Sequence, residues 1–156
     1  MLSSIFDKDA DKILDLASYM VMSENNKMQY FDYYGYDHSL FSKEVFSDST
    51  ISNLLEKLKI KDIDIFLEAW VKIHIKDIVY IAYDSSNMNC EAGNIELVEY
   101  GHAKDREDLP QINLSLAYDQ TNQVPLFYEI YPGSLIDNTE CQKMVERANT
   151  CTMFYT

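Results

Sequence analysis

The hydrophobic and polar positions along the chain follow a helical period upstream of residue 75 and a strand-like period downstream of it. Apolar residues from Ile13 to Val21 fall at helical spacing, and Asp7, Asp9 or Asp11 could cap this first helix. The polar run from Ser23 to Asn26 is a natural stop. The pattern therefore predicts that the chain begins with a helix.

Two further helices are expected before residue 75. The run Ser47-Asp48-Ser49-Thr50 is an N-cap cluster, and an apolar stripe from Ile51 to Leu58 follows it. The next helix is expected from Asp62, and the residues expected on its apolar face are Ile63, Phe66, Leu67, Trp70 and Ile73, with His74 as a further candidate. His74 is interpreted as a packed histidine, with a ligand role as the alternative.

The segment from Tyr30 to Tyr36 is dense in aromatic residues. We interpret it as a short helical turn or buried loop whose rings pack into the core. A platform on which nucleic-acid bases stack is the functional alternative. The many neighbouring acids favour core packing, because they would repel phosphates.

Downstream, three runs are typical of strands. The run Ile78 to Tyr83 is almost entirely apolar and ends on Asp84. The run Ile112 to Tyr118 alternates, which predicts a drier face made by its apolar residues. Residues 119–123 have hairpin-turn length, and the run Pro125 to Tyr131 follows, with Glu129 expected on the wetter face. Together they predict an antiparallel meander whose first strand carries Asp84.

A last helix is expected after Pro132-Gly133. Asp137 and Glu140 resemble a capping box, and a core-facing stripe from Cys141 to Ala148 follows. Asp137 is interpreted as a helix cap, with a metal-ligand role as the alternative. Residues 151–156 are strand-like, and no further strand or helix is predicted after them. The sheet is therefore expected to be incomplete within these 156 residues.

Composition narrows the class of protein. With 156 residues, 47% hydrophobic and 25% charged, the chain is in the range of one globular domain. It contains no apolar run of the roughly 20 residues that a membrane span needs, and its first residues do not resemble a signal peptide. Three irregularly spaced cysteines indicate reduced thiols, and we therefore expect a cytoplasmic protein.

The net charge of −13 is spread over both halves of the chain. Residues 1–75 carry 8 Lys and Arg against 13 Asp and Glu (−5), and residues 76–156 carry 5 against 13 (−8). Because Lys and Arg usually neutralise the phosphates of bound nucleic acid, this chain offers no ordinary basic patch. A role on DNA would need metal ions or segments outside these residues.

Asp84 is the first candidate for chemistry. An ionised acid at the end of a buried strand must be paired or bound to a cation to offset its desolvation. Taken alone, Asp84 is better interpreted as a cap of the turn that follows the strand, as Asp often is. The sequence blocks around it favour a role in catalysis.

Three blocks carry a resemblance to a known family. Tyr83-Asp84-Ser85-Ser86 resembles the first catalytic strand of DDE transposases of bacterial insertion sequences. The block from Gly101 to Ile112 is similar to that family's G-x-S-K-D-x-R-x-D-L-P-Q block, with Ala103 where Ser is frequent. Residues 124–137 resemble its G-x-P-L and P-G-N-x-x-D block, with Gln123 where Gly is usual. The resemblance covers roughly residues 75–148.

The resemblance implies an RNase-H-like sheet that holds an Asp-Asp-Glu triad and two magnesium ions. Asp84 would be the first acid, both catalytic and metal-binding. The second acid would lie on a strand after the helix at 137–149 and the third on a later helix, and neither matches a residue of this chain. The implied partner is transposon-end DNA, which the family cuts and then joins through the freed 3′-hydroxyl.

The missing acids limit what this chain is expected to do. Two-metal catalysis needs several carboxylates to hold both ions. A single carboxylate holds Mg²⁺ weakly, so Asp84 alone should bind it with a Kd of roughly millimolar or weaker. His102, Lys104 and Arg106 are candidate DNA contacts. Their acidic neighbours favour instead a loop held by local salt bridges.

The sequence thus predicts an α/β protein with a helical region at 1–74 and a partial RNase-H-like transposase core at 75–156, inactive alone. The first alternative is a non-enzymatic relic or small acidic interaction protein that self-associates through an open sheet edge. A second alternative is an unrelated acidic α/β binding module.

Overall fold

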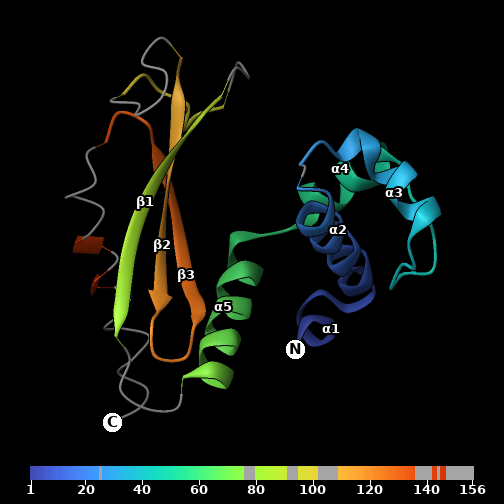
Figure 1. The fold of residues 1–156 in the computed structure, drawn as a ribbon, viewed down its shortest axis with the longest axis horizontal. Helices are drawn as coiled ribbons and strands as arrows, with labels where there is room; N and C mark the ends of the chain where they lie inside the picture. Colours follow the sequence, from blue (N-terminus) through green and yellow to red (C-terminus); the bar gives the residue numbers. More distant parts are fainter. Residues whose placement is uncertain are drawn as a thin grey trace. The chain divides into compact units, whose positions relative to one another are not determined.

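The computed structural model describes residues 1–24, 26–75, 80–90, 95–101, 109–135, 142–143 and 145–146. The chain divides into two compact units, Met1–Ala69 (the helical unit) and Trp70–Thr156 (the sheet unit). Helices make up the first and an antiparallel sheet is the main element of the second (Figure 1). The predicted mixed α/β class is therefore confirmed. We predicted a boundary at residue 74, and the division lies slightly upstream of it.

The described helices of the helical unit range from three to fifteen residues. The last of them, α5, continues into the sheet unit by one turn. The elements are α1 Leu2–Phe6, the 3₁₀ helix η1 Asp7–Asp9, α2 Ala10–Ser23, the 3₁₀ helix η2 Met28–Tyr30, α3 Phe31–Asp37, α4 Asp48–Lys57 and α5 Ile60–His74.

The three predicted helices are present, with small differences at their ends. Helix α2 ends at Ser23, and Glu24 follows in the left-handed conformation with φ of 49°. Helix α4 begins after Ser47, whose side chain accepts a hydrogen bond from the Thr50 backbone N–H, as the N-cap cluster predicted. Helix α5 begins at Ile60 rather than Asp62.

Aromatic side chains build the core of the helical unit. The Phe31 ring is fully buried, lies 4.5 Å from the Phe46 ring and meets the Tyr19 ring edge-on at 5.7 Å, centroid to centroid. The buried core residues are Leu16, Tyr19, Phe31, Phe46, Ile51 and Leu54. The aromatic segment around Phe31 is thus helical and contributes to the core, as interpreted, although Tyr33 and Tyr36 are exposed.

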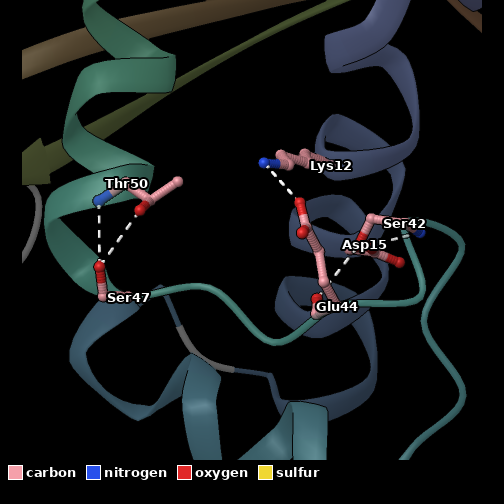
Figure 2. A network of polar contacts seen from close by, with 6 residues as sticks. All are labelled: Lys12, Asp15, Ser42, Glu44, Ser47 and Thr50. Carbon is pink, nitrogen blue, oxygen red and sulfur yellow. Dashed lines mark hydrogen bonds and ion pairs between the residues drawn. The ribbon is translucent and has the colours of Figure 1, made fainter.

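Polar contacts tie the loop after α3 to α2 (Figure 2). The Asp15 carboxylate is buried and accepts hydrogen bonds from the backbone N–H groups of Phe41 at 2.7 Å and Ser42 at 3.0 Å. Nearby, Lys12 Nζ lies 2.7 Å from Glu44 Oε1 and 5.4 Å from the centroid of the Phe46 ring. A buried carboxylate is tolerated here because the loop supplies two donors.

The last turn of α5 belongs to the sheet unit. The Trp70 indole N–H donates to the Pro125 carbonyl at 2.7 Å. The His74 ring lies 3.9 Å from the Trp70 ring, and its Nδ1 is 2.8 Å from the Trp70 carbonyl oxygen. His74 is therefore a packed histidine, as interpreted. The expected apolar face was wrong at Ile73, which is exposed, whereas Val71 is buried.

The sheet has three antiparallel strands in the order β1-β2-β3. They are β1 Ile81–Asn89, β2 Gln111–Asp119 and β3 Val124–Pro132, and β2 lies between the other two (Figure 1). The predicted meander and the turn at 119–123 are confirmed. A register shift between Ala117 and Tyr118 interrupts the pairing of β2 with β3.

Across the described residues, no helix has both the length and the apolar character needed to cross a membrane.

Candidate functional site

Asp84 lies in the middle of β1 and not at its end. The strand continues through Ser85 to Asn89, so the predicted strand end at Asp84 was wrong. Asp84 is paired with Leu116 of β2, which is paired in turn with Tyr128 of β3. The Asp84 side chain is exposed. Its position is therefore that of an accessible carboxylate on an outer strand of the described sheet.

The sheet face that carries Asp84, called here the Asp84 face, has one charged residue in the described strands. Alternate residues of a strand share a face, and directly paired residues lie on the same face. Its members are Ala82, Asp84, Ser86 and Met88 of β1, Ile112, Leu114, Leu116 and Tyr118 of β2, and Tyr128, Ile130 and Pro132 of β3. Asp84 thus stands alone as an anionic group among neutral neighbours.

The opposite face, called the Ser115 face, is the more buried one although it is rich in polar residues. Every β2 residue on it is buried, and none of the β2 residues on the Asp84 face is. The Ser115-face residues of β2 are Gln111, Asn113, Ser115, Ala117 and Asp119. The predicted drier face of β2 was therefore wrong. Glu129 is half-buried on the Ser115 face beside Ser115, so its assignment to a wetter face was wrong as well.

Hydrogen bonds explain why polar residues are buried at one end of this face. The Asn113 carboxamide donates to the carbonyls of Pro132 at 3.2 Å and Leu135 at 3.2 Å, and the Gln111 carboxamide donates to that of Gly133 at 3.1 Å. The backbones of Gln111 and Glu99 exchange two hydrogen bonds of 2.9 and 3.1 Å. The second and third sequence blocks that carried the family resemblance are thus joined here by structural contacts.

At the other end of β2, Asp119 organises the hairpin turn. Its carboxylate accepts hydrogen bonds from the Thr121 N–H at 2.8 Å, the Asn122 N–H at 3.2 Å and the Asn122 side chain. Burial alone would raise the pKa of Asp119, but the hydrogen bonds from Asn122 and Thr121 outweigh it, so the pKa lies below its ordinary value of 3.8. Sequence analysis missed this role; the signal was an Asp followed by Asn three residues later in a turn.

Two buried hydroxyls remain without a partner in the described part of the sheet unit. They are Tyr83 Oη on β1 and Ser115 Oγ on β2, both on the Ser115 face. The buried side-chain oxygen Gln111 Oε1 also has no hydrogen-bond partner in the described residues. Such groups are uncommon in folded proteins because desolvation is not compensated. They lie across the sheet from Asp84, and we assign them no part in its chemistry.

The predicted DNA contacts His102, Lys104 and Arg106 lie outside the described residues, and so does Asp137. Among the described residues, no group of three or more His, Cys, Asp or Glu side chains is placed to hold a metal ion. The donor set around Asp84, one carboxylate with the Ser86 hydroxyl on the same face, suits a single weakly held hard cation. It does not suit a two-ion centre.

Comparisons of the chain with protein-family models, with curated proteins and with solved structures found no match.

Proposed function

We propose that this chain provides the first strands and the first metal-binding aspartate of a DDE-transposase core of RNase-H-like type, whose family cuts and joins DNA at transposon ends. The observation that supports it most is the position of Asp84. It is an exposed carboxylate on the outer strand of an antiparallel meander, alone among neutral residues. Because the carboxylate is exposed, a hydrated cation can reach it, and no other charged residue of the described strands lies on that face.

The blocks Gly101–Ile112 and 124–137 support the same proposal through their part in the fold. They contain Gln111 and Gly133, whose contacts hold β2, the end of β3 and the segment at Glu99 together. A shared structural framework is a physical reason for these residues to recur together in a family. The proposal is therefore independent of whether His102, Lys104 or Arg106 contact DNA.

Asp84 would act by holding a divalent cation. Magnesium prefers oxygen ligands and keeps several waters when one carboxylate holds it. Two-metal phosphoryl transfer needs further carboxylates, and Asp84 is the one charged residue on its face of the described strands. We therefore expect residues 1–156 alone to leave DNA uncut.

A nicking assay tests that expectation. Purified protein is incubated with supercoiled DNA carrying the element's ends and Mg²⁺ or Mn²⁺, and Asp84→Ala serves as the matched variant. We expect no cleavage above background from either protein. Robust cleavage that Asp84→Ala abolishes would contradict the proposal that the catalytic centre is incomplete. It would mean that residues 1–156 contain the further groups with which Asp84 cleaves DNA.

Reading the DNA that follows codon 156 tests the family assignment itself. Codons for a further strand that ends in an acid followed by Gly would support a transposase core. A domain of typical size is encoded by several hundred bases, roughly. If such codons are absent over a stretch of that length, the result would favour the alternative below.

The alternative function is self-association of a small acidic protein through the edge of β1. In the described sheet β1 has β2 on one side only, and its nine residues include no proline and no lysine, the residues that commonly protect an edge. On the Asp84 face each strand also has an exposed apolar residue, Met88 on β1, Leu116 on β2 and Ile130 on β3. This combination favours pairing with a second chain.

Analytical ultracentrifugation over a concentration series tests the alternative. Ser86→Lys adds a charge to the β1 edge and should abolish concentration-dependent association if the edge is the interface. Ser52→Lys makes the same change on an exposed position of α4 and should leave association unchanged. A sharply melting monomer in the unmodified protein would contradict this alternative.

A further inference from the structure

We draw no further inference here: the strongest candidate, the surface patch of exposed apolar residues Met88, Leu116 and Ile130 on the Asp84 face of the sheet, carries none, because nothing in the structure shows what covers that face.

Discussion

Asp15, Asp84 and Asp119 illustrate how environment separates the roles of one residue type. Asp15 is buried in α2 and accepts two backbone N–H groups of the following loop. Asp119 is buried in the β2–β3 turn and accepts three hydrogen bonds from Thr121 and Asn122. Asp84 is exposed on a neutral sheet face. The first two are structural by their contacts, and the third is the residue for which we propose a cation.

Asp15→Ala should destabilise the helical unit. The substitution leaves the part-buried N–H groups of Phe41 and Ser42 without their acceptor, which costs about 1–3 kcal/mol in the free energy of unfolding. Urea denaturation followed by helical circular dichroism measures it. The control Asp37→Ala removes an exposed carboxylate and should change the free energy by less than about 0.5 kcal/mol. Equal losses would contradict the assigned role of Asp15.

Asp119 should make stability depend on pH at the acid end. Because its folded pKa lies below 3.8, its stabilisation is fully present above that value and is lost as the pH falls through the lower folded pKa. Asp119→Asn presents an amide N–H₂ to the Asn122 side-chain donor, so it should melt lower than the unmodified protein at pH 7. The difference in melting temperature between the two proteins should become smaller below pH 3.8. A gap that stays constant between pH 7 and pH 3 would refute this.

At the scale of elements, the helices and the meander could be predicted because their signals are local. The apolar stripe of α2, the Ser47 cap and the alternation along β2 each depend on neighbours in sequence. The buried face of β2 could not be predicted in this way. Asn113 and Gln111 are buried because carbonyls about twenty residues away accept their hydrogen bonds, and the sequence pattern carries no such long-range information.

The same limit applies to the candidate site. The sequence singled out Asp84 and its place on the first strand of a meander, both of which the structure contains. It misjudged where that strand ends, because the polar residues Ser85, Ser86 and Asn87 looked like a loop and are paired with β2 instead. Cross-strand pairing stabilises residues that have weak strand propensity of their own.

Gly133→Ala tests the joint between the strands. An added Cβ would lie 2.3 Å from the Gln111 carbonyl oxygen and 2.5 Å from that of Glu99, and backbone atoms cannot move away cheaply. We expect a loss of about 3 kcal/mol in the free energy of unfolding of the sheet unit, measured by urea denaturation followed by Trp70 fluorescence.

Gly35→Ala is the matched control. Its Cβ would meet only side-chain atoms of Val45 and Leu40, at 3.1 Å and beyond, and alanine favours the helical backbone of α3. The stability of this variant should stay within about 1 kcal/mol of the unmodified protein. A cost at Gly133 no larger than the cost at Gly35 would show that the close approach at Gly133 is not required.

At the scale of the whole molecule, the net charge of −13 sets the conditions for any test of metal binding. Divalent cations gather weakly around many exposed carboxylates, so a bulk affinity says little about Asp84. A local probe is needed, together with a variant that removes one carboxylate while keeping the shape of the side chain. The sheet register supplies the reporters, because Leu116 and Tyr128 lie beside Asp84 on successive strands.

Paramagnetic broadening by Mn²⁺ in ¹⁵N spectra provides that probe. We predict that substoichiometric Mn²⁺ broadens the amide signals of Asp84, Leu116 and Tyr128 before others in the sheet unit. Asp84→Asn should abolish this effect, and Glu96→Gln, which neutralises an exposed acid of the same unit, should leave it intact. Broadening that persists in Asp84→Asn, or that centres on other residues, would contradict the assignment of Asp84 as a cation ligand.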